Sequence, residues 1–349
     1  MKTHVMIARP TSAIGSLLGG LLCLCATAAG GRIEVGQLDL PAVSSPSSFE
    51  RVDFQQSFDR APLVFAVTPD TGDGRGIVRL NNVDTTGFDL AFLEAPAEDA
   101  DHGTVQGVSF IAIEPGRHEL APGVVIEAGS IETSDTVVGG GPEPSRVVQY
   151  KGGFSGTPVV VTATQTFRNE PNAQPGTISS PFLATSVDDV TSNDFKVALE
   201  RAETLDGSSV TEPETIAYLV FPEVIGSTTN DQGNPVLFDA LNSGDIVDDD
   251  PTFVAFNQAF ASTPLVLAQQ VSRDGSDGGW VRLQSATAGG ASVFIQEDVF
   301  GDAETNHIDE EVALLAFAEA FEAELNFVTT TITWQGADAF STNTANWDN

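Results

Sequence analysis

Two loops rich in Gly and Asp carry the residues best suited to binding chemistry. The stretch DTGDGRGIVRL covers residues 70–80, and its counterpart DGSDGGWVRL covers residues 274–283. Carboxylates and guanidinium groups form hydrogen bonds with polar ligands such as sugar hydroxyls, and an indole ring offers an apolar face for stacking. We therefore expect a ligand-binding polar rim made of Asp70, Asp73 and Arg79 in the first loop and Asp274, Asp277, Trp280 and Arg282 in the second.

Two alternatives stay open for these loops. Gly and Asp favour turns, and each arginine can pair with a neighbouring acid such as Glu94 or Glu297 without any ligand. The other alternative is a Ca²⁺ site, although the spacing D-x-x-D-G differs from the EF-hand pattern.

The elements that position these loops occur three times along the chain. The segments VDFQQSFDRAPLVF, VQYKGGFSGTPVVV and VAFNQAFASTPLVL begin at Val52, Val148 and Val254. In each segment, an aromatic residue is followed four positions later by Phe and eight positions later by Pro. The three copies are spaced by about one small domain.

Each copy continues with two further strand patterns. GFDLAFLE from residue 87, DFKVALER from 194 and ASVFIQED from 291 alternate apolar and polar residues, as half-buried strands do. Each copy then closes with an apolar run, namely VSFIAIEPG, IAYLVFPE or VALLAFAE. The Ala, Glu and Leu of the third run favour a helix, but its place in the repeat predicts a strand at 311–318, and we give the repeat more weight than propensity.

These patterns predict an all-β protein of three tandem antiparallel β-sandwich domains with about six strands each. Gly, Pro, Asp and Asn separate the short strands, and no long helix is indicated. We place the three repeats at 29–131, 147–226 and 251–328, with linkers at 132–146 and 227–250.

Two histidines, His102 and His307, precede the closing strands of the first and third copies at nearly equivalent places. They are either surface histidines or ligand contacts, and Glu310 and Glu311 beside His307 favour a ligand contact. The chain has only 4 histidines, so a transition-metal cluster is not expected.

The first copy resembles the H-type lectin domain. The residues that carry the resemblance are Phe54, Phe58, Pro62-Leu63-Val64, Gly87-Phe88 and Val108-Ser109-Phe110-Ile111-Ala112. The resemblance covers residues 50–114 and, nearly as well, residues 250–318, whereas the middle copy keeps only the ends of the pattern.

This resemblance implies a six-stranded antiparallel sandwich that forms trimers and binds sugars such as galactosamine derivatives near subunit edges. Three copies in one chain would then form an internal pseudo-trimer. Lectins of this family often have Trp in the closing strand, where this chain has Phe110, Tyr218 and Leu314. The sugar specificity therefore stays open.

The composition indicates a folded protein with an acidic surface. The chain has 49 acidic and 15 basic residues, for a net charge of −34, and 41% of its residues are hydrophobic. Such a charge disfavours nucleic acids and anionic membranes as partners. It suits a secreted protein in salty water or a protein that binds cations.

The N-terminal residues 1–28 have the features of a signal peptide. Lys2 and Arg9 precede an apolar run, and Ala26-Thr27-Ala28 matches a cleavage site. We therefore expect an extracellular or cell-surface location, with a lipoprotein anchor at Cys23 or Cys25 as the alternative. The apolar run is too short to indicate a membrane span.

The C-terminal residues 329–349 fall outside the third repeat and contain Trp334 and Trp347. They are either a polar tail or the start of a truncated β-repeat with the W…NW form of autotransporter-like proteins.

No sequence motif indicates catalysis. The chain has no G-x-S-x-G, HExxH or phosphate-loop motif, and no carboxylate pair stands out among its 49 acids. We expect a secreted, non-catalytic protein without a cofactor that binds glycans or is adhesive. The alternatives are a purely structural surface or matrix spacer and, third, a polysaccharide-acting enzyme.

Overall fold

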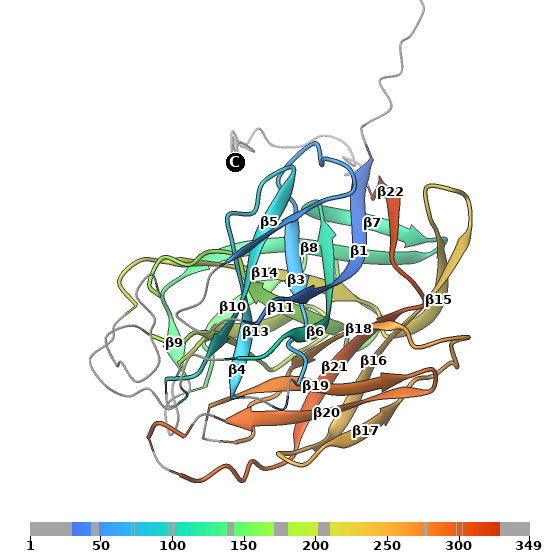
Figure 1. Cartoon of the computed structure of the whole chain (residues 1–349). Helices are drawn as coiled ribbons and strands as arrows, with labels where there is room; N and C mark the ends of the chain where they lie inside the picture. The colour runs from blue at the N-terminus through green and yellow to red at the C-terminus, as the bar shows by residue number, and fades with distance from the viewer. Residues whose placement is uncertain are drawn as a thin grey trace, which may run out of the picture.

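The computed structural model confirms an all-β chain (Figure 1). It describes residues 30–42, 49–70, 72, 74–96, 98, 102–137, 143–170, 181–201, 210–275, 278–297, 299–301 and 303–328. These residues form mainly antiparallel sheets and contain no helix. The expected signal peptide at 1–28 and the C-terminal segment at 329–349 lie outside the described residues.

The largest sheet combines strands from both ends of the chain. Its eight strands are, in spatial order, β11 (Val159–Thr164), β14 (Glu214–Phe221), β8 (Val124–Thr133), β7 (Gly116–Ala121), β22 (Phe321–Phe327), β1 (Gly31–Leu40), β6 (Val105–Ile113) and β3 (Leu63–Ala66). A separate four-stranded sheet contains β15 (Val224–Thr229), β16 (Pro235–Val247), β21 (Glu310–Phe317) and β18 (Leu265–Gln270).

Three smaller sheets complete the fold. They contain β2 (Glu50–Asp53), β5 (Gly87–Glu94) and β4 (Gly76–Asn81); β10 (Arg146–Gln149), β13 (Asp194–Glu200) and β12 (Ala184–Asp188); and β17 (Thr252–Ala255), β20 (Gly290–Glu297) and β19 (Gly279–Thr287). The short strand β9 (Thr136–Val137) pairs with β13 in parallel.

Each small sheet packs against a strand that closes one of the sequence copies. In the first copy, Phe88 of β5 lies 5.2 Å from Phe110 of β6 between ring centroids. In the middle copy, Phe195 of β13 lies 5.7 Å from Tyr218 of β14. In the third copy, strands β20 and β21 contribute to one apolar cluster. One face of β6, β14 and β21 is therefore covered by a small sheet.

The opposite face of these closing strands is buried as well. Ile111 and Ile113 of β6 belong to one large apolar cluster together with Leu315 and Phe317 of β21. A strand with two buried faces needs apolar residues at every position, not at alternate ones. This explains the uninterrupted run VALLAF in the third copy, and the predicted strand at 311–318 is confirmed as β21.

The strand that follows each closing strand pairs away from it. β7 follows β6 but pairs with β8, and β15 follows β14 but pairs with β16. β22 follows β21 but pairs with β1, with Phe321 opposite Val35. The last described strand thus joins the first, more than 280 residues earlier in the sequence (Figure 1).

This pairing corrects the expected boundaries between repeats. The boundary at residue 131 cuts through β8, which pairs with β14 of the middle copy. The expected linker at 227–250 contains half of β15 and all of β16, and the expected linker at 132–146 contains β9. The sequence pattern missed β8 and β16 as framework strands because the recognised repeat begins one strand later.

At one equivalent position of the three closing strands, the size of the side chain is matched to the size of the residue that faces it on the neighbouring strand. Gly36 lies opposite Phe110, and Gly129 lies opposite Tyr218; a Cβ atom on either glycine would come within 2.5 Å of the facing ring. The third copy has Leu241 opposite Leu314 instead. The aromatic residue of the first two copies therefore requires a glycine partner, and two leucines share the same space in the third.

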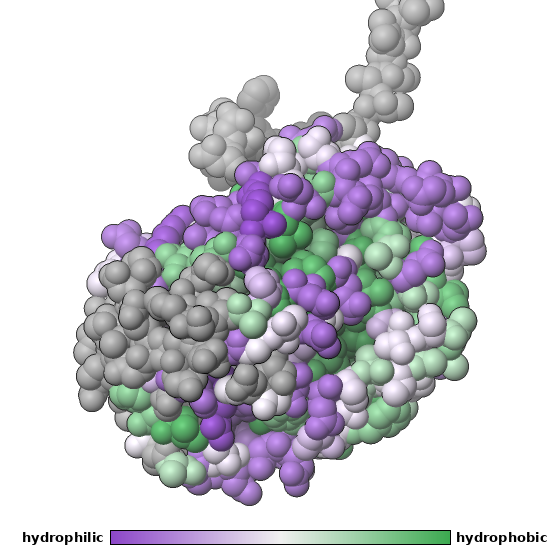
Figure 2. Space-filling model, viewed as in Figure 1, coloured by the Kyte–Doolittle hydropathy of each residue, from purple (hydrophilic) through white to green (hydrophobic). Residues whose placement is uncertain are grey.

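The surface in Figure 2 is largely hydrophilic, with apolar residues gathered in a hollow across the middle of this face. The large apolar side chains exposed on the described surface include Ile225, Ile246 and Phe253.

We predict that Phe321→Ala lowers stability far more than Phe253→Ala. Phe321 of β22 is 6% exposed and belongs to the central cluster, whereas Phe253 is 54% exposed. Truncating a buried Phe costs about 3–5 kcal/mol, and an exposed substitution about 0.5 kcal/mol or less. Urea unfolding of both variants measures the difference. Equal losses would show that β22 is not part of the cooperative core.

Candidate functional site

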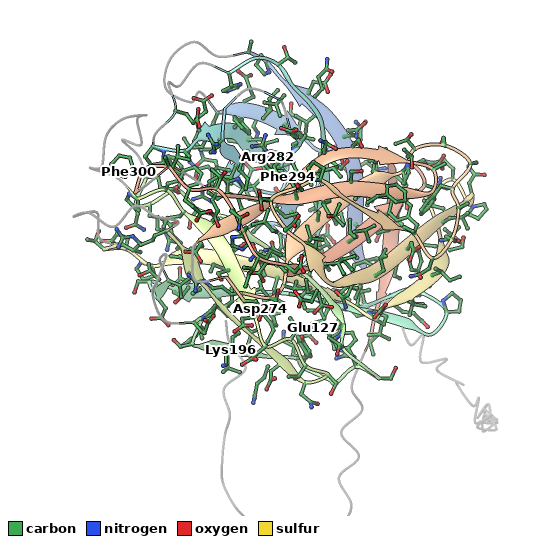
Figure 3. All side chains as sticks on the ribbon, turned by 90° about the horizontal axis from the view of Figure 1, so that it is seen from below. Glu127, Lys196, Asp274, Arg282, Phe294 and Phe300 are labelled. Carbon is green, nitrogen blue, oxygen red and sulfur yellow. The ribbon has the colours of Figure 1, made fainter. Side chains whose placement is uncertain are left out.

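Arg282 of β19 lies in the interior of the protein and holds the first of the two loops. Its side chain is fully buried and donates hydrogen bonds from Nε and Nη2 to the Pro69 carbonyl at 3.1 and 2.9 Å. The Asp70 carboxylate lies 3.6 Å away, and the guanidinium lies over the Phe92 ring. Figure 3 shows Arg282 beside Phe294 of β20, its cross-strand neighbour.

Two hydrogen bonds between backbone groups also stabilise this contact between the third and first copies. The Asp70 amide donates to the Leu283 carbonyl at 2.8 Å, and the Leu283 amide donates to the Thr68 carbonyl at 2.9 Å. The two similar loops are thus linked, because the strand behind the second loop binds the start of the first.

Arg79 of β4 makes the equivalent contact with the middle copy. It is 3% exposed and pairs with Glu170, which is fully buried, with Nε 3.1 Å from the carboxylate. It also donates to the Thr166 carbonyl at 3.2 Å. Like Arg282, Arg79 stacks its guanidinium over an aromatic ring of the copy that it binds, here Phe167.

The contact between the middle and third copies has the opposite polarity. The three small sheets can be aligned on the equivalent residues Glu94, Glu200 and Glu297, whose partners across the strands are Gly76, Ala184 and Gly279. Three residues after these partners come Arg79, Val187 and Arg282, so the middle copy has Val187 where the other two copies have arginine. Here Arg273, from the loop after β18, donates to Glu200 at 3.0 Å. We call the contacts of Arg79, Arg273 and Arg282 the three arginine latches.

The arginine latches correct the expectation of a polar rim. Arg79 and Arg282 lie in the interior rather than at a loop tip, because each must reach backbone carbonyls of another copy. The acids that they meet, Glu170 and Asp70, also differ from the neighbouring Glu94 and Glu297 that the turn interpretation assumed.

The acidic loop residues have separate surroundings. Asp70 is half-buried, and its carboxylate accepts a hydrogen bond from the Gly72 amide at 3.1 Å. Such a bond to the backbone two residues later is typical of Asp in a turn. Asp274 is largely exposed, and its pKa is raised by partial desolvation of its carboxylate and by the nearby charges of Glu310 and Asp245. Asp73 and Asp277 lie outside the described residues.

The residues that the structure describes contain no group of three or more His, Cys, Asp or Glu arranged to hold a metal ion. A calcium site at the two loops therefore rests on the sequence alone.

Trp280 is buried where a stacking face was expected. It is 5% exposed and packs on Phe182 of the middle copy, with ring centroids 5.1 Å apart. Its indole ring thus forms a contact between the third and middle copies, while Arg282 on the same strand contacts the first copy.

The two histidines are buried rather than exposed, each with 4% of its surface accessible. His102 packs on Phe92 and contacts the Gly103 carbonyl at 2.8 Å. His307 lies between Glu297 and Glu310, with Nε2 3.1 Å from the Glu310 carboxylate and Nδ1 bonded to Glu297.

The surroundings of His307 favour its charged form. Burial alone lowers the pKa of an imidazole, but the hydrogen bonds and negative charges of Glu297 and Glu310 outweigh this and raise the pKa of His307 to about 9. His307 is therefore a buried cation at neutral pH, as the arginines are.

A further set of buried carboxylates was missed in the sequence. Glu34, Glu127 and Asp239 are buried at equivalent positions opposite Ala112, Val220 and Ala316 of the closing strands. Each accepts backbone amides of the loop that follows the first strand of the repeat, at Gln55, Lys151 and Asn257. The weak motif I-E-V-G, I-E-A-G and F-D-A-L was the available signal.

One open groove of about 460 Å³ lies beside Glu34, and another of about 410 Å³ lies between Phe154 and Ile225. Neither groove is lined by the two acidic loops, by Trp280 or by the two histidines, whereas Phe110 of the first closing strand lines the first groove. The first is bordered by β1, β2 and the start of β22.

Comparisons with known proteins give one similarity. No protein-family model matches the chain, and no solved structure matches it significantly. Halomucin from Haloquadratum walsbyi is 25% identical over 284 residues, which is 78% of this chain and 3% of halomucin. The chain thus spans only a small part of the length of this relative. In the described residues, no helix is long and apolar enough to cross a membrane.

We predict that Arg79→Met destabilises the protein much more than Lys196→Met. Removing Arg79 leaves Glu170 buried without its cation, which costs about 3–5 kcal/mol. Lys196 forms an exposed pair with Asp189, so its loss should change the unfolding midpoint little. Thermal unfolding at low and high salt is the measurement. Similar losses for both variants would show that the Arg79 contact is not a buried latch.

We predict that His307→Gln lowers the melting temperature at pH 6 and that this difference shrinks above pH 9. The folded-state pKa of His307 is raised to about 9 from 6.5, so its stabilisation is complete below pH 6.5 and is lost as the pH rises through 9. Melting curves from pH 6 to 10 for both proteins measure the difference. A difference that grows with pH would contradict a charged His307.

Proposed function

We propose that this chain is an extracellular, non-catalytic surface module that binds glycans or is adhesive. In this proposal, three β-sandwich repeats form an internal pseudo-trimer. The observation that carries it is the set of three arginine latches, one at each contact between two copies. The pairing of β22 with β1 and the central cluster shared by the three copies support the same arrangement.

An extracellular location is supported by the charge of −34 and the signal-peptide pattern. The similarity to a stretch of halomucin is compatible with a module of a long surface protein. The buried ion pairs suit such surroundings because salt screens exposed charges far more than buried ones.

Glycan binding, if it follows the resemblance to H-type lectins, requires a site other than Arg79, Arg282 and Trp280. These three side chains hold the copies together, so their removal would damage the fold and any binding surface alike. This observation favours a second candidate function, a purely structural spacer, whose repeats match because their contacts do.

Binding of the intact secreted protein to a broad glycan array at high salt tests the proposal. We expect binding to a subset of glycans without release of new reducing ends, and one arm with Ca²⁺ and one with a chelator test the calcium interpretation. Absence of binding in both arms would favour the spacer, and released reducing ends would indicate the polysaccharide-acting enzyme.

A further inference from the structure

The groove beside Glu34, which we call the β1 groove, opens where β22 stops covering the sheet. β22 pairs with β1 only over Gly31–Val35, whereas β1 continues to Leu40 paired with β6. The groove has a volume of about 460 Å³. Binding sites for small ligands usually have volumes of roughly 300–1,000 Å³. The β1 groove is thus large enough for one or two sugar rings.

The buried carboxylate at this groove differs from its two counterparts. Glu127 accepts the Lys151 amide with both oxygens and also binds Arg117. Asp239 accepts the amides of Asn257 and Gln258 and the Asn257 side chain.

In the described part of the chain, Glu34 accepts a single hydrogen bond, from the Gln55 amide at 3.1 Å. An ionised carboxylate accepts about four hydrogen bonds. Glu34 therefore keeps acceptor capacity that Glu127 and Asp239 have already used.

A second carboxylate stands next to Glu34. Glu322 lies directly opposite Glu34 in the pairing of β1 with β22, so both side chains point to the same face of the sheet. Burial and the charge of Glu322 raise the pKa of Glu34 to about 7. Asp53 adds a third carboxylate at the rim, 3.6 Å from Arg51, a cation that it shares with Asp84 and Asp89.

The nearby cation does not neutralise the β1 groove. Arg32 is already bound by Asp231, Glu322 and Glu324, at 3.0, 2.6 and 2.9 Å. The groove therefore presents hydrogen-bond acceptors and repels anions. Its ligand must donate hydrogen bonds and carry no negative charge.

The remaining groups at the β1 groove suit a hydroxylated ring. The side chains of Gln37, Gln55 and Gln232 line it. The Gln37 amide nitrogen already donates to the Gly107 carbonyl and the Ser109 hydroxyl, each at 3.3 Å, so its oxygen is left to accept. The amides of the other two can donate and accept. Phe110 and Phe321, mostly buried, supply apolar contact at its floor.

We propose that the β1 groove binds neutral saccharides of one or two rings and rejects carboxylated and sulfated ones. This inference rests on the proposed glycan-binding function and gives it a site. Hydroxyl groups would donate to Glu34, Asp53 and Glu322, while the amides orient the ring.

The test compares rim, floor and control variants of the full chain on the same glycan array. Asp53→Asn/Gln55→Ala changes two exposed rim side chains, and Glu34→Gln changes the floor without changing its size. Glu223→Gln, in the groove near Phe154, is the matched control. Melting curves establish that every variant is folded.

We expect both β1-groove changes to weaken binding of neutral saccharides at least tenfold and the control to leave it unchanged. Unmodified saccharides should bind better than their sialylated or sulfated forms. Binding that survives both groove changes would overturn this site but keep the glycan-binding function. No saccharide binding by the unmodified protein would overturn both.

Discussion

The strands β6, β14 and β21 must be buried on both faces, and the rest of the structure follows from this constraint. One face of each strand is covered by a small sheet, and the other joins a central apolar cluster that includes residues of all three sequence copies. No single copy can supply that second layer, because its own strands are already used for the first. The copies therefore depend on one another for burial. The described residues contain no cysteine, so this burial is achieved there without disulfide bonds.

The buried positive charges also link one copy to another. The protein has few basic residues and a strongly acidic composition, yet Arg79, Arg273 and Arg282 are each 5% exposed or less. Burying a guanidinium is costly unless it is paired and hydrogen-bonded, and these three meet backbone carbonyls or carboxylates of another copy. His307, held between two glutamates, follows the same rule. The cations thus hold the interior together while the surface stays acidic, which keeps separate molecules apart through like-charge repulsion.

The functional interpretation changes with this geometry. The two loops that suggested a sugar site are joined by a latch, and Trp280 is covered by Phe182. The site that we propose lies instead where the repeat is least complete, beside Glu34, because β22 covers only part of β1. The equivalent carboxylates Glu127 and Asp239 are occupied by loop amides, so an element that is structural in two copies is left partly open in one. Our proposal therefore rests on a difference between the repeats and not on their similarity.

The sequence by itself determined the all-β class, the existence of three copies and the strand character of residues 311–318. These features depend on local spacing, since an aromatic-Phe-Pro pattern and an apolar run are readable wherever they occur. Only the tertiary structure decided which strands pair, because β7, β15 and β22 leave the copy that precedes them in the sequence. It also decided the roles of the arginines. The same residues at the same spacing fit both an exposed polar rim and a buried latch. The two roles differ only in the groups, distant in the sequence, that each guanidinium contacts. In the third latch, the middle copy has Val187 in place of the arginine, and Arg273 of the third copy supplies the cation instead. The repeat pattern could not predict this exchange, because the compensating charge lies in another copy.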